Sequence, residues 1–194
     1  MITTLDPRTA LILIDLQTGI TARPTAPHPV ATVLQNAAHL IDAFHAAAQP
    51  VIIVNVVPSA DPARTKLRVE KPLGAMGQIP PNFSDIVPEI KSKTRPTDLH
   101  ITKRTWSAFW NTPLHAELQK RSITQLVLAG ISTSIGVEAT ARAANELAYN
   151  QAFVTDAMTD SDATAHTHTL QTIFPRLGEQ GTTAELLAKL AAIR

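Results

Sequence analysis

The sequence contains no cysteine, which excludes disulfide bonds, thiolate metal sites and catalysis by a cysteine nucleophile. It also lacks an excess of charge of either sign, since 17 Lys and Arg residues balance 16 Asp and Glu residues and give a formal net charge of +1. A chain with this balance has no broad electrostatic attraction for nucleic acid or an anionic membrane surface. We therefore expect a small-molecule substrate, and neither nucleic acid nor a membrane as partner.

Long hydrophobic runs and a targeting segment are missing as well. No apolar run approaches the roughly 20 residues of a membrane-spanning helix, and the N-terminal MITTLDPRTA lacks a basic region followed by an apolar one. We expect a cytoplasmic protein. With 194 residues, of which 44% are hydrophobic, the chain can bury a substantial core, and we expect a single domain over residues 1–194.

The chain does contain a regular alternation of two patterns. Short apolar, β-branched runs of the kind that buried parallel strands require occupy residues 10–15, 51–57, 99–103, 125–130 and 151–156. Apolar residues at helical spacing occupy residues 29–48, 113–122, 134–150 and 162–174, and a closing helix follows Thr182 or Thr183 as N-cap. This alternation predicts a three-layer α/β domain with helices on both faces of a parallel sheet.

Two connections are long and rich in proline and polar residues, at positions 18–29 and 57–82. Ligands of open parallel sheets bind beyond the C-terminal ends of the strands, where such connections emerge. These connections are therefore candidate walls of a site, with mobile surface insertions as the alternative.

Two polar residues and a glycine mark three of the predicted strand ends. Asp15 and Lys103 each end an apolar run, and Gly130 ends a third run just before a helix that begins near Ser134. The backbone N–H groups at the start of that helix are suited to bind an anion or a developing oxyanion. Taken singly, Asp15 is also typical of a turn cap and Lys103 of a solvated surface lysine.

These three strand ends carry a family resemblance. The segments ALILIDLQ, ITKRTWSAFWNTPL, LVLAGISTSIGVEATARAA and VTDAMTD resemble, in this order, the motifs of the isochorismatase-like hydrolase superfamily, over nearly the whole chain. The resemblance implies an α/β/α sandwich of Rossmann-like topology with five or six strands, and a homo-oligomer, either a dimer or a tetramer. It also implies catalytic roles for Asp15 and Lys103, with Gly136 at the position of the family's cysteine nucleophile.

Glycine at position 136 excludes an acyl-enzyme formed there. The nearby hydroxyls of Ser132, Thr133 and Ser134 point in other directions and are suited to capping the helix. Isochorismatases are similar in carrying glycine at this position, and they hydrolyse a vinyl ether without a covalent intermediate. The resemblance therefore implies that Asp15 acts as a general acid on a small carboxylate-bearing substrate of the isochorismate type.

Two other functions remain open at this stage. One is water-mediated hydrolysis of an amide or ureido substrate with Asp15 as base, and the other is a catalytically inactive protein that binds a metabolite or a protein partner. Nicotinamidases of the same superfamily bind a metal through Asp and His residues on the connection after the second strand, and the 57–82 connection here holds no histidine, so the resemblance implies no metal site. We also expect no cofactor. The i, i+2 spacing of His166 and His168 places them on different helix faces, which favours a surface or capping role.

Further substrate contacts are predicted around these residues. The expected substrate-binding residues are Ser132, Trp106, Gln78, Phe109 and Ile135, and Arg64 and Arg68 are further candidates for binding an anion. Trp106 and Phe109 suit core or subunit packing equally well. The resemblance further implies a non-proline cis peptide bond at Ile131–Ser132, which would turn the amides of Ser132 and Gly136 towards the pocket, and structural roles for Arg142 and Asp156.

Overall fold

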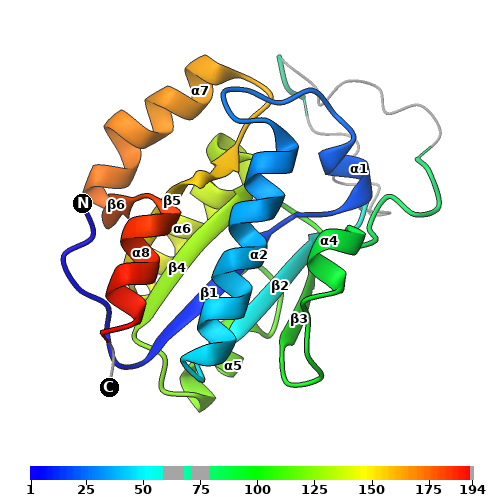
Figure 1. Cartoon of the computed structure of the whole chain (residues 1–194). Helices are drawn as coiled ribbons and strands as arrows, with labels where there is room; N and C mark the ends of the chain where they lie inside the picture. The colour runs from blue at the N-terminus through cyan, green and yellow to red at the C-terminus, as the bar shows by residue number, and fades with distance from the viewer. Residues whose placement is uncertain (59–67, 71–78, 193–194) are drawn as a thin grey trace.

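Six parallel strands form a sheet through the centre of the molecule (Figure 1). The computed structural model describes residues 1–58, 68–70 and 79–192. The strands are β1 (Thr9–Ile14), β2 (Val51–Val56), β3 (Leu99–Lys103), β4 (Gln125–Ile131), β5 (Asn150–Thr159) and β6 (Glu179–Gly181). Their spatial order is β3-β2-β1-β4-β5-β6, so the chain winds outward from β1 in one direction and then from β4 in the other.

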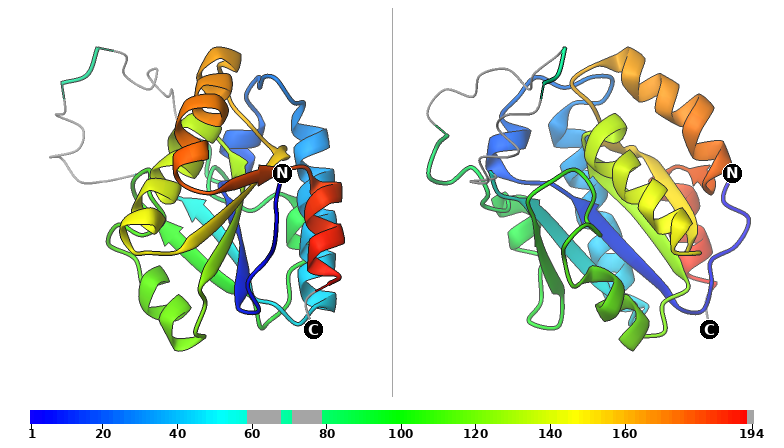
Figure 2. Two further views of the ribbon diagram at one scale, coloured as in Figure 1. Left: turned by 90° about the vertical axis from the view of Figure 1, so that its left-hand side faces the viewer. Right: turned by 180° about the vertical axis from the view of Figure 1, so that it is seen from behind.

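Helices cover both faces of this sheet. They are α1 (Thr18–Thr21), α2 (Val30–Ala46), α4 (Pro88–Lys91), α5 (Leu114–Lys120), α6 (Glu138–Glu146), α7 (Ala163–His168) and α8 (Thr183–Leu190), with a π-helical turn η1 (Thr133–Val137) before α6, and η2 (Thr169–Ile173) and η3 (Phe174–Arg176) after α7. Seen from the side, α2 and α8 lie on one face, and α5 and α6 lie on the other (Figure 2). The expected three-layer α/β/α fold is confirmed.

The side chains of β1 explain why the sheet lies in the middle. All six of its residues are buried, as in β4. Leu11 and Leu13 pack in the core cluster under α2 and α8, whereas Ile12 and Ile14 pack in the cluster under α5 and α6. Burial of each such side chain contributes about 1.5–3 kcal/mol, so a strand that is apolar on both faces is stable only between two helical layers.

The structure departs from the sequence-based expectations in several places. The helix expected over residues 134–150 begins as the π-turn η1 and ends at Glu146. Strand β6 was not expected as a separate segment, because its three residues contain no apolar side chain. The closing helix α8 does begin after a threonine N-cap: Thr182 and Glu185 form a capping box.

None of the described helices is long and apolar enough to span a membrane.

Candidate active site

The C-terminal ends of β1 and β4 meet where the strand order changes direction, which is the usual ligand position in sheets of this type. Ile14 of β1 lies opposite Gly130 of β4. Gly130 has a φ of +125°, and a Cβ atom there would lie 2.1 Å from the carbonyl oxygen of Ile14. Only glycine permits this approach of the two strand ends.

Asp15 follows β1 and forms a buried ion pair with Lys103, the last residue of β3. The Nζ of Lys103 lies 2.7 Å from Oδ2 of Asp15 and donates a second hydrogen bond, of 3.0 Å, to the carbonyl oxygen of Thr105. The two residues are only 5% and 2% exposed. Asp15 has a φ of +54°, a conformation that aspartate tolerates better than most residues, and its N–H donates to the carbonyl of Val54.

The environment of Asp15 favours its protonated form. Burial raises the pKa of the Asp15 carboxyl to about 6, and the charge and hydrogen bond of Lys103 oppose this rise without cancelling it. Its Oδ1 is buried and has no hydrogen-bond partner among the described residues. Asp15 can therefore hold or accept a proton near neutral pH, and Oδ1 is the oxygen left for that proton because Oδ2 already accepts from Lys103.

Gly136 faces the same carboxyl from the turn after β4. A Cβ atom on Gly136 would lie 3.3 Å from Oδ2 of Asp15 and 2.9 Å from Cγ2 of Ile14. The fold thus brings Asp15, Lys103 and Gly136 together, as the sequence predicted. Where a nucleophilic side chain would begin, this chain has only a hydrogen atom, and Cγ2 of Ile14 occupies part of the position that a Cβ atom would take.

The turn that carries Gly136 has the expected cis peptide bond at Ile131–Ser132. Ser132 is the N-cap of η1, but its side chain makes no capping hydrogen bond. The hydroxyl of Thr133 donates to the carbonyl of Thr159 (3.1 Å), and the N–H of Ser134 donates to Oδ2 of Asp160 (2.7 Å). The expectation that these hydroxyls cap the helix is therefore not met, because a buried aspartate takes that role.

His166 corrects another expectation. It is 3% exposed, and its Nδ1 lies 2.8 Å from Oγ1 of Thr133. Burial and the neighbouring His28 lower the pKa of the His166 imidazole, with Asp160 acting in the opposite direction. The expected surface or capping role holds for the exposed His168 but is wrong for His166, which packs against the turn of the site.

The other predicted site residues are placed as follows. Ser132 and Ile135 are half-buried in the turn, and Arg68 is exposed. Trp106 is 53% exposed in the connection after Lys103. The ring of Phe109 stacks on Tyr149, with centroids 6.0 Å apart, so it packs against the core layer under α5 and α6. Gln78 and Arg64 lie outside the described residues. Arg142 pairs with Glu138, and Asp156 binds Thr183.

Three residues that support the site were missed from the sequence: Gln17, Thr140 and Asp160. Gln17 is fully buried and bonds both backbone groups of Val56 and the carbonyl of Phe83, which ties the end of β1 to the end of β2. All three lie within the segments that carry the family resemblance, but no hydrophobic pattern distinguishes them from the other polar residues of these segments. Within the described ranges, no three His, Asp or Glu side chains lie close enough to hold a metal ion.

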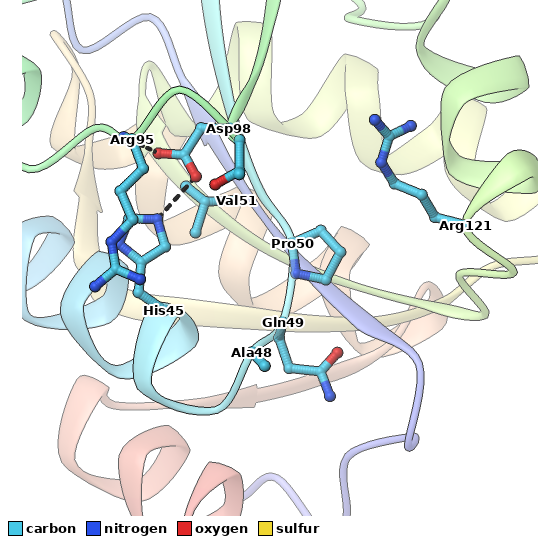
Figure 3. Close-up of a pocket in the computed structure, with 9 residues that line it drawn as sticks. His45, Ala48, Gln49, Pro50, Val51, Arg95, Asp98 and Arg121 are labelled. Atoms are coloured by element: carbon cyan, nitrogen blue, oxygen red, sulfur yellow. Dashed lines mark hydrogen bonds and ion pairs between the residues drawn. The ribbon is translucent and has the colours of Figure 1, made fainter.

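A pocket at the opposite edge of the sheet does not contain any of these residues (Figure 3). It is bordered by the C-terminal end of α2 and the start of β2, and His45 lies beside Asp98 there, with Nε2 2.8 Å from Oδ1. The N–H of Arg95 donates to the other oxygen of Asp98. The ion pair of His45 and Asp98 joins α2 to the segment that leads into β3. This structural role accounts for the burial of both side chains.

Comparisons with known proteins identify one family. A family model described as the Isochorismatase domain matches residues 9–185. The isochorismatase family protein YwoC of Bacillus subtilis (strain 168) is 39% identical over 184 residues, which cover 94% of each chain. The isochorismatase family protein YecD of Escherichia coli O157:H7 is 37% identical over 188 residues, which cover 94% of this chain and 96% of YecD.

A solved structure is similar over the full length. An isochorismatase family protein from Burkholderia thailandensis has a TM-score of 0.88 and 38% sequence identity, with 99% of this chain and 100% of that chain covered. The range of the family model, residues 9–185, includes Asp15, Lys103 and Gly136.

Proposed function

The chain belongs to the isochorismatase family of hydrolases, and we propose that it hydrolyses a small carboxylate-bearing vinyl ether of the isochorismate type by proton transfer from Asp15. One observation carries this proposal: a buried carboxyl with a raised pKa and an unpartnered oxygen faces a glycine in place of a nucleophile. Such a site can donate a proton but cannot form a covalent intermediate at position 136.

The proposed reaction begins with the proton on Oδ1 of Asp15. Transfer of this proton to the terminal vinyl carbon converts the ether to an oxocarbenium ion, and the Asp15 carboxylate that remains is stabilised by the ammonium group of Lys103, 2.7 Å away. Water then adds to the cationic carbon and returns a proton to Asp15. The hemiketal formed in this step collapses to a keto acid and an alcohol, with one proton moving to the leaving oxygen.

Lys103 acts mainly on Asp15 in this proposal. Two of its three N–H donors are used by Asp15 and Thr105, and the residue is 2% exposed. One donor remains for the ether oxygen or carboxylate of a substrate. Trp106, Phe109, Ser132, Ile135 and Gln78 are the proposed further contacts of the substrate.

A second candidate function is hydrolysis of an amide or ureido substrate by a water molecule that Asp15 activates as a base. The absence of a side chain at Gly136 favours it, because no nucleophile stands beside Oδ2, where a Cβ atom would lie 3.3 Å away, and water must then attack the carbonyl carbon. A carboxylate with a pKa of about 6 is mostly ionised above neutral pH and is then a competent base.

The deciding experiment is incubation of the purified protein with isochorismate while pyruvate release is followed. Turnover that Asp15→Asn abolishes supports the vinyl ether reaction, since the amide is nearly isosteric but has no transferable acid proton. If wild type and Asp15→Asn are equally silent with isochorismate but differ on a panel of amides and ureido acids, the second function is supported. Silence of both proteins on every substrate would indicate a family member that binds a ligand without turnover.

We also propose a homo-oligomer, a dimer or a tetramer. Trp106 and Trp110 are 53% and 60% exposed, and large aromatic side chains with this exposure are typical of interfaces. Analytical ultracentrifugation of the purified chain tests this proposal, and a purely monomeric sedimentation profile would contradict it.

A further inference from the structure

Thr140 makes two hydrogen bonds that join separate parts of the site. It lies in the first turn of α6 and is fully buried. Its hydroxyl donates to the carbonyl oxygen of Gly136, at 2.7 Å, and accepts from the N–H of Ala108, at 3.0 Å. One side chain thus bonds both the turn with the glycine and the connection that follows Lys103.

These two segments come from distant places in the sheet. Ala108 lies in the connection from β3 to α5, and Gly136 follows β4, whereas β2 and β1 lie between these strands. The same connection includes Thr105, whose carbonyl accepts from Nζ of Lys103. A closed path of contacts therefore runs from Gly136 through Thr140 and Ala108 to Lys103, and from Lys103 to Asp15, whose Oδ2 faces Gly136.

We propose that Thr140 is a positioning residue of this site. Its hydroxyl holds the connection that carries Thr105 and Trp106 against the turn that carries Gly136. This contact thereby sets the position of Lys103 and of the connection relative to the carboxyl of Asp15. Thr140 itself does not contact substrate, because it is fully buried. The catalytic part of this inference rests on the proposed function, and the structural part does not.

An ordinary helical threonine does not account for the observed contacts. Threonine hydroxyls in helices commonly donate to the carbonyl four residues earlier, and that explains the bond to Gly136 alone. The bond from Ala108 is a second, long-range contact, and it satisfies a buried backbone N–H that lies outside the helices and strands. Next to it, Phe109 stacks on Tyr149, so the connection is fastened at two consecutive residues.

The chain provides its own reporter for this connection. It contains two tryptophans, Trp106 and Trp110, and both lie between β3 and α5. Tryptophan fluorescence anisotropy therefore measures the mobility of this segment without any substrate. Thr140→Val keeps the shape but removes both bonds, and Thr140→Ser keeps both bonds.

A suitable control is Thr9→Val. Thr9 is also fully buried, but it begins β1 at the other end of the sheet, and its hydroxyl has no hydrogen-bond partner in the described part of the chain. We expect Thr140→Val to add a fast component to the tryptophan anisotropy decay, and Thr140→Ser and Thr9→Val to match the wild type. In the wild-type protein, the Ala108 amide should exchange its hydrogen at least about a hundredfold more slowly than an unprotected amide.

The catalytic part predicts that Thr140→Val lowers kcat about ten- to a hundredfold, because a misplacement of the site groups by less than 1 Å has an effect of this size. The kcat of Thr140→Ser should lie within about twofold of the wild-type value. Equal loss in the valine and serine variants, wild-type anisotropy in Thr140→Val, or rapid exchange of the Ala108 amide would overturn the inference. If no substrate is hydrolysed by the wild type, the proposed function fails, while the anisotropy and exchange measurements still decide the role of Thr140.

Discussion

Lys103 and Asp15 form an ion pair of 2.7 Å in which both side chains are buried, and one oxygen of the carboxylate has no hydrogen-bond partner among the residues that the structure describes. The same pairing on the surface would keep Asp15 ionised at all moderate pH values. Here, burial outweighs the attraction of Lys103 and places the pKa of Asp15 at about 6. The reaction at the site therefore depends on whether the protonated or the ionised form of Asp15 is the active one.

The pH dependence of kcat/KM distinguishes the two proposed functions. If Asp15 is a general acid, the protonated form is active, and kcat/KM should be constant below pH 6 and fall about tenfold per pH unit above the pKa of about 6. If Asp15 is a base, kcat/KM should rise with pH up to this pKa and then level off. A profile without a transition between pH 5 and 7, on a substrate whose turnover depends on Asp15, would contradict both assignments.

Replacement of Lys103 tests the electrostatic balance at Asp15. Lys103→Met removes the charge that lowers the Asp15 pKa, so this pKa should rise above 6, as measured by carboxyl ¹³C chemical shifts during an NMR titration. The ionised Asp15 is then buried without a partner, and the free energy of unfolding should fall by about 3–5 kcal/mol at pH 8. The loss should be smaller at pH 5, where the carboxyl is protonated and needs no counter-charge.

Lys93 offers a matched control for this variant. Its Nζ lies 2.6 Å from Oδ2 of Asp42, a similar distance, but these side chains are 39% and 53% exposed. Lys93→Met should lower the free energy of unfolding by less than about 1 kcal/mol, with little dependence on pH. Equal effects of the two substitutions in urea unfolding would show that burial does not set the behaviour of the Lys103 pair.

The sequence was sufficient to predict the layers of the fold, and the family resemblance was sufficient to predict that Asp15, Lys103 and Gly136 lie together. Strands β1 and β4 are apolar on both faces, and Asp15 follows β1 whereas Lys103 ends β3, so the parallel topology carries both side chains to one edge of the sheet. The contacts of Thr140 and Asp160 could not be predicted in this way. They depend on how the connections after β3 and β5 fold back over the turn at Ser132, and such connections have no periodic pattern. The burial of His166 has the same cause, because α7 packs its histidine against Thr133.

The N-cap of α8 gives a test of local stability away from the site. The hydroxyl of Thr182 accepts from the N–H of Glu185, and the Glu185 carboxylate accepts from the N–H of Thr182. Thr182→Ala should lower the free energy of unfolding by about 1 kcal/mol in chemical denaturation. Thr182→Ser, which retains the cap, is the control, and an effect as large as that of alanine would indicate that the threonine methyl, not the capping bond, is responsible.

Gly130 and Gly136 should respond very differently to alanine, although both lie at the end of β4. At Gly130, the new Cβ would lie 2.1 Å from the backbone oxygen of Ile14, at a φ of +125° that alanine rarely adopts. Backbone atoms cannot move aside without breaking the pairing of β1 with β4, so Gly130→Ala should lower the free energy of unfolding by about 3 kcal/mol or more.

At Gly136, the nearest atom to the new Cβ is the side-chain Cγ2 of Ile14, at 2.9 Å, and the next is Oδ2 of Asp15, at 3.3 Å. The fully buried Ile14 must shift to relieve this contact, so Gly136→Ala should cost about 1–3 kcal/mol in stability. Its effect on catalysis should be larger than this cost suggests, because the methyl group lies in contact with Oδ2 of the reacting carboxyl. Combination with Ile14→Leu, which removes the Cγ2 branch, should recover part of the stability but not the activity. Recovery of both would mean that strain on Ile14, and not the contact with Asp15, causes the loss of turnover.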